Sequence, residues 1–426
     1  MPEQPSEQNN GNSQATGPPS LQRNIAIIYA LGFFSALQLI VPIFVPLLQG
    51  HGLTMAEILQ TQAVFAFLIA TLELPSGYLA DMIGRKRVLL AGSIIAAAAS
   101  YVMMHAQSFT DFLLFEALMG IAVSLTSGAD IALLYDTRNA LGHKASSNAR
   151  VFGNLLSTSS VAECLAGVLA SLLLMHSTEA LLLCQFVLAL SPIAIACLLV
   201  EPPQVVRTTV PELSLRQTLT VLLRERPLVL WIGISGVAFG SVGLFAFWTQ
   251  QKYWQLAGID MRYFGLIWAG FCLLRAIAAN IAQPLEQQLG IKRLLVLLYL
   301  LPVLALATMA YAPIAFGVAA GLMFPLMRGI AAVILIDALN TRIAANYRAS
   351  INSLMSLATR ATFIVLAPIL GYGIDAIGVR QTLIVLLVLV VPGLATVCIK
   401  LHSSVATDRE TQRAKHHAEQ SKVAAR

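Results

Sequence analysis

Ionisable side chains lie inside several long apolar stretches of this 426-residue chain. A charged group surrounded by hydrocarbon is costly, so each is a functional candidate unless a neighbouring side chain pairs with it. The two signs are segregated, because the carboxylates lie mainly in the first half of the chain and the guanidiniums lie in the second. The set comprises Glu73, Glu116, Asp130 and Glu163, followed by Arg275, Arg328, Asp337 and Arg360.

Three of the acidic residues are candidates for proton coupling, namely Glu116, Asp130 and Glu163. A buried carboxylate can take up a proton near neutral pH, which coupling to a proton gradient requires. Glu116 and Asp130 are fourteen residues apart, close to four helical turns, so they share one side of a helix. The alternative is a structural carboxylate that pairs with a neighbouring helix, and Glu73 fits that interpretation better.

The three arginines are candidates for substrate binding. Arg275, Arg328 and Arg360 each fall near the middle of an apolar stretch. Arginine stays charged and binds carboxylate or phosphate groups in a bidentate manner, so three of them would attract an anion. The alternative is internal pairing with Asp337, although one carboxylate neutralises only one guanidinium.

Two further residues are candidates for the substrate site. Gln38 precedes Pro42 and Pro46, which indicates a polar and bendable wall. Trp248 belongs to an aromatic and amide cluster (Phe245, Phe247, Gln250, Gln251, Tyr253 and Trp254) that ends an apolar stretch. Aromatic residues at this level usually fix a helix in the membrane interface, and an outer gate is the alternative.

The apolar stretches predict an all-α membrane protein. The chain is 57% hydrophobic and 11% charged, with a mean hydropathy of +0.76, whereas soluble domains contain about 25% charged residues. Stretches of this length can cross a hydrocarbon core as helices. We expect twelve spans, at 24–49, 55–81, 87–106, 110–137, 149–175, 179–200, 227–250, 261–289, 291–311, 313–341, 348–374 and 380–401.

The cations predict how the spans are oriented. With both termini in the cytoplasm, 21 of the 27 Lys and Arg residues lie on the inner side and 3 on the outer side. The expected regions are a disordered tail (1–22), a six-helix half (23–200), a cytoplasmic connector (201–226), a second six-helix half (227–402) and a charged tail (403–426). Because most cations lie in short loops, nucleic acid is not an expected partner.

A loop between two spans carries a recognisable pattern. It contains Gly77, Asp81, Gly84, Arg85 and Lys86, with Met82 where Arg is usual. The segment resembles the signature of the major facilitator superfamily between its second and third helices. The resemblance implies that Asp81 and Arg85 form a gating network with Asp136 at the end of the fourth helix. The alternative is that the cations only set the topology.

Weak internal repeats support two related halves. GRKR at 84–87 recurs as GIKR at 290–293, and YDTR at 135–138 recurs as LNTR at 339–342. Duplicated halves of this kind place the substrate site near the bilayer midplane and transport by alternating access.

The sequence therefore predicts a monomeric secondary transporter in the bacterial inner membrane, in contact with lipid, a small-molecule substrate and protons. We expect proton-coupled export of an anionic metabolite, such as a carboxylate siderophore or an organic acid. The alternatives are broad-specificity drug efflux, a proton-symport importer and a non-transporting membrane sensor. No enzyme motif is visible, no cofactor is expected besides the proton gradient, and five scattered cysteines give no metal site.

Overall fold

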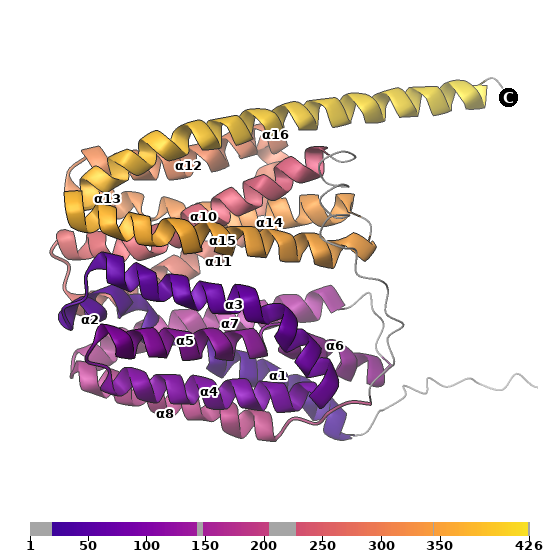
Figure 1. Ribbon diagram of the computed structural model, residues 1–426. Helices are drawn as coiled ribbons and strands as arrows, with labels where there is room; N and C mark the ends of the chain where they lie inside the picture. Colours follow the sequence, from indigo (N-terminus) through magenta and orange to yellow (C-terminus); the bar gives the residue numbers. More distant parts are fainter. Residues whose placement is uncertain (1–18, 143–147, 204–226, 344, 425–426) are drawn as a thin grey trace, which may run out of the picture.

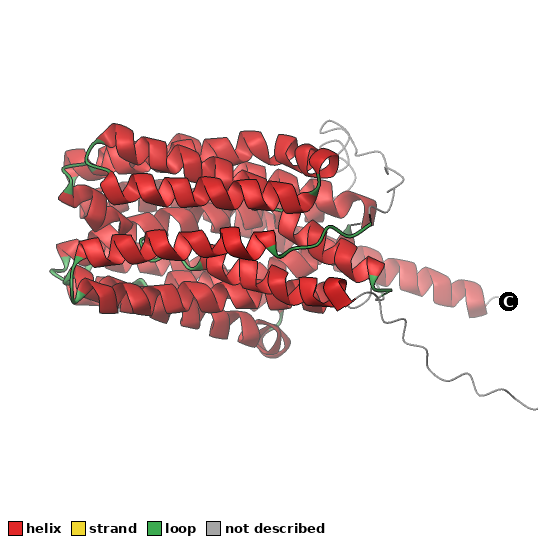
Figure 2. Ribbon diagram, turned by 90° about the horizontal axis from the view of Figure 1, so that it is seen from below, coloured by secondary structure: helices red, strands yellow, loops and turns green. Residues whose placement is uncertain are grey.

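Twelve helical segments of the computed structural model are long and apolar enough to cross a bilayer. The structure describes residues 19–142, 148–203, 227–343 and 345–424, and helices are its only regular elements there (Figures 1 and 2). The prediction of an all-α protein with twelve spans is confirmed. Most of the predicted connector (201–226) lies outside the described residues.

The first six spans form the part that we call the N-terminal half. The first and fourth spans each consist of more than one helical segment. The elements are α1 (Pro19–Ala36), η1 (Val41–Ile43), α2 (Phe44–Gly50), α3 (Met55–Ile83), α4 (Arg85–His105), α5 (Phe109–Thr126), α6 (Ala129–Ala140), α7 (Asn148–Leu174) and α8 (Thr178–Cys197).

The last six spans form the C-terminal half. Its elements are α10 (Pro227–Leu256), η4 (Met261–Tyr263), α11 (Phe264–Leu289), α12 (Ile291–Tyr311), α13 (Ile314–Ala320), α14 (Met323–Arg342), α15 (Ala345–Ile377) and α16 (Val379–Ala424). Helix α16 projects past the rest of the bundle (Figure 1), so the predicted tail from 403 onward begins as a continuation of the last helix.

The two halves lie side by side, with the N-terminal helices below the C-terminal helices in Figure 1. They meet mainly where α3 packs on α15 and where α7 packs on α11. We call the end of the bundle with the Gly84 turn the inner end, and the end with the Gly52 turn the outer end, following the predicted orientation. The domain boundaries given above stay a prediction.

Three spans that the sequence predicts as continuous helices are interrupted. The first span (predicted 24–49) is broken between α1 and η1, next to Pro42, which has no N–H to donate. The fourth (predicted 110–137) is broken at Gly128, whose φ of 83° is left-handed. The tenth (predicted 313–341) is broken at Gly321 between α13 and α14. Hydropathy does not detect these breaks because the flanking residues stay apolar.

The turns at the outer end are fixed by short polar side chains. Thr54 and Glu57 form a capping box at the start of α3, and Ser108 and Asp111 form another at the start of α5. Asp260 accepts hydrogen bonds from the side chain and backbone of Arg262, which lower the pKa of this exposed carboxyl to about 2.

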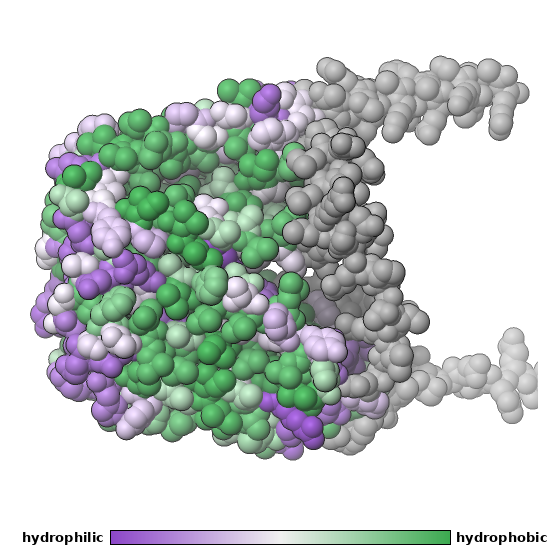
Figure 3. Space-filling model, viewed as in Figure 1, coloured by the Kyte–Doolittle hydropathy of each residue, from purple (hydrophilic) through white to green (hydrophobic). Residues whose placement is uncertain are grey.

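The flank of the bundle is apolar. Green, hydrophobic side chains cover much of the face in Figure 3, and hydrophilic ones gather toward the outer end at the left. Large apolar side chains are exposed along α3 and α16, among them Leu74 (78%) and Leu389 (68%). In water such a surface would be unfavourable, whereas a bilayer solvates it, so these helices face lipid.

Candidate functional site

An ion pair joins the two halves in the middle of the bundle. The guanidinium Nη2 of Arg275 on α11 lies 2.5 Å from the carboxylate Oε2 of Glu163 on α7. The side chains keep 26% and 35% of their accessible surface, respectively, so the pair is partly hydrated. Asp337, the internal partner considered from the sequence, is therefore not the partner of Arg275. Asp337 lies exposed on α14, toward the inner end.

A cavity of about 310 Å³ surrounds this ion pair. Residues from both halves line it, from the first and fifth spans on one side and from α10, α11 and α14 on the other. The lining residues are Ala36, Gln38, Val41, Glu163, Leu244, Phe247, Trp268, Arg275 and Arg328. Of the predicted substrate residues, the structure therefore brings Gln38, Arg275 and Arg328 together, next to the predicted proton site Glu163.

Arg328 adds a positive charge that the cavity does not neutralise. Among the described residues, its guanidinium forms neither an ion pair nor a hydrogen bond, in contrast to Arg275. Gly243 on α10 provides the space for its side chain, because a Cβ at that position would lie 2.6 Å from Cδ of Arg328. Two guanidiniums and one carboxylate give the cavity a net charge of about +1 when all are ionised.

Gln38 is held in place by a second glutamine. Gln185 on α8 is buried, its Oε1 accepts a hydrogen bond from the backbone N–H of Leu39 at 2.6 Å, and its Nε2 donates to Oε1 of Gln38 at 3.0 Å. The side chain of Gln185 thus satisfies backbone exposed by the break in the first span, and it orients the amide of Gln38 at the cavity. Sequence reasoning did not identify Gln185.

The other two predicted proton sites lie away from this cavity. Glu116 on α5 is buried and accepts a 2.5 Å hydrogen bond from Nε2 of Gln62 on α3, inside the N-terminal half. Asp130 lies at the start of α6, where its carboxylate accepts a hydrogen bond from the N–H of Ile131 at 2.7 Å. A role of either residue in proton coupling stays a prediction.

Arg360 also lies apart from the residues that line the cavity. It is on α15, and the charge that acts on it comes from Glu73 on α3, across the boundary between the halves. Its Nε is buried and has no hydrogen-bond partner within the described part of the chain. The predicted substrate contact of Arg360 finds no support in this conformation.

Close backbone contact seals the bundle on the outer side of the ion pair. Gly265 on α11 and Gly167 on α7 approach so closely that a Cβ on Gly265 would lie 2.1 Å from the carbonyl oxygen of Gly167. The hydroxyl of Ser171 accepts a hydrogen bond from the N–H of Leu266 at 2.9 Å beside this contact. Only glycine allows two helices to approach this closely.

A second seal lies between α3 and α15. The carboxylate of Asp375 accepts hydrogen bonds from the backbone N–H groups of Met55 and Ala56, at 3.0 and 2.7 Å. These N–H groups have no partner within α3 because they lie in its first turn, where the helix dipole also favours a negative charge. Trp248 belongs to this outer closure, because its ring packs on Phe44 of the other half with centroids 5.5 Å apart. The predicted substrate contact of Trp248 is therefore not supported in this conformation.

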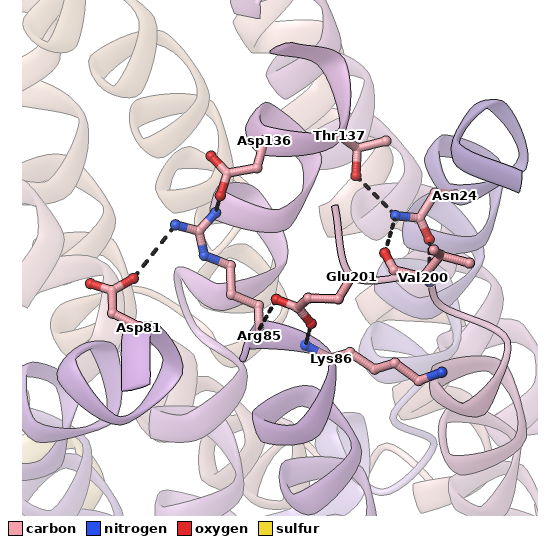
Figure 4. Close-up of polar contacts among 8 residues, drawn as sticks. All are labelled: Asn24, Asp81, Arg85, Lys86, Asp136, Thr137, Val200 and Glu201. Carbon is pink, nitrogen blue, oxygen red and sulfur yellow. Dashed lines mark hydrogen bonds and ion pairs between the residues drawn. The ribbon is translucent and has the colours of Figure 1, made fainter. Parts of the chain in front are cut away.

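The predicted gating motif forms a network within the N-terminal half (Figure 4). The guanidinium of Arg85 pairs with Asp136 on α6, and it lies 3.6 Å from Asp81 on α3. Gly84 connects α3 to α4 with a φ of 96°, a conformation that glycine adopts readily. Gly77, about two helical turns earlier on α3, is exposed. The motif ties the second, third and fourth spans together, and its role in gating stays a prediction.

Glu201 completes this network and was not identified from the sequence. Its two carboxylate oxygens accept hydrogen bonds from the backbone N–H groups of Arg85 and Lys86, both at 2.8 Å (Figure 4). It thus caps the start of α4. Asn24 similarly connects Thr137 with Val200. The position of Glu201 directly after an apolar span indicated a capping carboxylate. The N–H groups that it binds are more than 100 residues away in the sequence, so the sequence did not indicate which helix it caps.

The family model of the Major Facilitator Superfamily matches residues 25–362 of this sequence. The chain belongs to that superfamily. It is therefore a secondary transporter, and the activity of this family is not enzymatic. No curated protein matches the sequence significantly.

Solved structures show the same fold for this major facilitator protein. A mutant of the nucleoside transporter NupG matches with a TM-score of 0.72 and 13% identity, covering 90% of this chain and 99% of that one. A bacterial homologue of the human lysosomal transporter Spinster, inward-facing and unoccupied, matches with a TM-score of 0.71 and 14% identity, covering 92% and 98%. At these identities the likeness establishes the fold and leaves the substrate open.

Proposed function

We propose that this transporter carries a small organic anion through the central cavity and couples its movement to protons. The observation that supports this most strongly is the Glu163–Arg275 ion pair between the halves, beside Arg328, which pairs with no residue that the structure describes. An unneutralised guanidinium inside a membrane protein is costly, and a bound carboxylate would remove that cost.

The size and charge of the cavity favour a small organic acid. About 310 Å³ is at the lower end of the range of roughly 300–1,000 Å³ typical of ligand sites. While Glu163 is ionised, the net charge near +1 is neutralised by one carboxylate. The larger carboxylate siderophore considered from the sequence fits this cavity less well.

Proton coupling in this proposal takes place at Glu163. Ionised Glu163 and a substrate carboxylate compete for Arg275, so uptake of a proton by Glu163 releases Arg275 for the anion. By thermodynamic reciprocity, a bound anion then increases the affinity of Glu163 for a proton. Ligands that favour each other's binding move together, so this geometry supports symport more than the export by antiport that we expected from the sequence.

The experiment has two steps. First, the medium of cells with and without the protein is compared to identify organic acids whose level changes. Each candidate acid is then added outside proteoliposomes that contain an internal pH-sensitive dye. Symport predicts acidification of the lumen, and antiport predicts alkalinisation. The proposal fails if only cationic or neutral compounds are carried, or if flux leaves the internal pH unchanged.

We propose the remaining features as the sequence suggests them: a monomer in the inner membrane with both termini in the cytoplasm. The cation bias of 21 inner against 3 outer residues supports this orientation. Reaction of a cysteine placed near the end of α16, in the predicted tail (403–426), with an impermeant reagent, before and after lysis of whole cells, tests it. Reaction before lysis would exclude the orientation.

A further inference from the structure

One glutamine of the C-terminal half binds the broken backbone of the first span. Gln251 lies on α10 near the outer end and is buried. Its Oε1 accepts a hydrogen bond from the N–H of Val45 at 3.0 Å, and its Nε2 donates to the carbonyl oxygen of Val41 at 3.1 Å. A single side-chain amide therefore satisfies two backbone groups of the opposite half.

These two backbone groups are natural partners of each other. Val41 and Val45 are four residues apart, the spacing at which an α-helix joins a carbonyl to an N–H group. Here the first span is broken, Val41 begins the short turn η1, and Val45 lies in the first turn of α2, where N–H groups have no partner within the helix. The carboxamide of Gln251 lies between the carbonyl of Val41 and the N–H of Val45 and bonds both of them. Insertion of a side chain between such a pair is a known cause of helix kinks.

We infer that Gln251 is an exchangeable partner of the first span, and that the bond from Val45 N–H to Val41 C=O replaces it when the outer end opens. Alternating access requires the halves to separate there. Separation withdraws Gln251, and the two backbone groups then satisfy each other. This inference rests on alternating access alone and does not depend on the identity of the substrate or on proton coupling.

The exchange explains how a contact at membrane depth can be broken at low cost. Orphaned backbone groups in a membrane cost several kcal/mol each by general estimates. The exchange leaves neither Val41 nor Val45 orphaned. The nearby prolines do not prevent it, because the bonds removed by Pro42 and Pro46 would involve the carbonyls of residues 38 and 42.

The exchange also links the outer closure to the cavity. Val41 is one of the residues that line the central cavity. When its carbonyl turns from Gln251 toward Val45, the cavity wall formed by the first span changes shape. Gln251 is thus a positioning residue, because it acts through the first span and does not line the cavity itself.

The neighbouring residue provides a matched control. Gln250 is also buried on α10, but its Nε2 donates to the carbonyl oxygen of Gly321 at 2.9 Å, within the same half. That hydrogen bond gives a partner to a backbone carbonyl at the interruption between α13 and α14. Because both groups belong to one half, the bond stays intact when the halves separate. The two adjacent glutamines therefore have the same chemistry but different roles.

The test measures opening of the outer end without a substrate. Ala36, which lines the cavity, is replaced by cysteine in a background from which the five native cysteines have been removed. Whole cells are treated with a membrane-impermeant maleimide. We expect Gln251→Leu and Gln251→Asn to increase the labelling rate about tenfold, because the closed state loses two hydrogen bonds of ordinary strength. Gln250→Leu should leave the rate unchanged.

Hydrogen exchange tests the replacement bond directly. In the Gln251→Asn variant, whose amide is one methylene too short to reach, the amide of Val45 should stay as protected as in the unaltered protein. Faster exchange at Val45 would overturn the inference, because it would show that no replacement bond forms. An unchanged labelling rate in both Gln251 variants, or an equal increase in Gln250→Leu, would also overturn it.

Discussion

Glu163 and Arg275 lie at the same depth in the two halves. Glu163 is eleven residues before the outer end of α7 at Leu174, and Arg275 is eleven residues after the outer start of α11 at Phe264. At 1.5 Å per residue, both are about 16 Å from the outer end, close to the middle of a 30 Å hydrocarbon core. The ion pair therefore lies where alternating access needs a site that both sides can reach.

A double-mutant cycle should measure this ion pair. We expect Glu163→Gln and Arg275→Gln each to lower the free energy of unfolding in detergent, because each leaves the other charge without its partner. The double variant should lose less than the sum, with an interaction of about 1–3 kcal/mol. The exposed pair Asp260–Arg262 is the control and should show little interaction. Additive effects at Glu163 and Arg275 would mean that the ion pair contributes nothing to the free energy of unfolding.

Gly243→Ala should weaken anion binding without unfolding the protein. The added Cβ would lie 2.6 Å from Cδ of Arg328, so the guanidinium must move in the cavity. We expect a loss of affinity of about tenfold for the transported anion, which corresponds to 1.4 kcal/mol. Gly233→Ala on the same helix is the control, since its Cβ would make only an ordinary 3.8 Å contact with Met355. Equal affinities in the two variants would argue against a role of Arg328 in binding.

Gly265→Ala should open the outer closure. Its Cβ would lie 2.1 Å from the carbonyl oxygen of Gly167, so α7 and α11 must separate at a cost of about 1–3 kcal/mol. Faster outside labelling of Ala36→Cys is the expected result. Gly270→Ala, on the same helix with open space around its Cβ, should behave as the unaltered protein does. A normal labelling rate in Gly265→Ala would show that closure does not depend on this contact.

Glu201→Ala should destabilise the N-terminal half by about 1–2 kcal/mol, because the N–H groups of Arg85 and Lys86 lose their acceptors. Glu201→Gln retains one acceptor oxygen and should lose less. Thermal unfolding in detergent measures both. Asp337→Ala is the control, since its exposed carboxylate makes no hydrogen bond to a described residue. A loss equal to that of the control would exclude capping by Glu201.

The spans could be predicted from the sequence because each depends on its own hydropathy and the charges around it. The sequence segregates the acids and the arginines between the two halves. It did not predict which of them pair, because both partners had to be counted from helix ends that the sequence defines only approximately. Arg360 shows the limit: its position in the middle of a helix was correct, but the side of α15 that it occupies depends on packing against α3.

The interruptions of the three spans, and the side chains that bond the backbone there, could not be predicted for a different reason. Pro42, Gly128 and Gly321 mark the three interruptions, yet proline and glycine also occur in continuous membrane helices. The residues that satisfy the broken backbone at Leu39 and Gly321 are Gln185 and Gln250, which lie far away in sequence. Only the tertiary arrangement brings these amides to the gaps.

The most direct measurement is the number of protons taken up when the anion binds. Calorimetry of binding in buffers with different ionisation heats gives this number. Competition between Glu163 and the anion for Arg275 predicts uptake of up to one proton per anion at neutral pH, and none in Glu163→Gln. Release of protons on binding, or the same uptake in Glu163→Gln, would contradict the account.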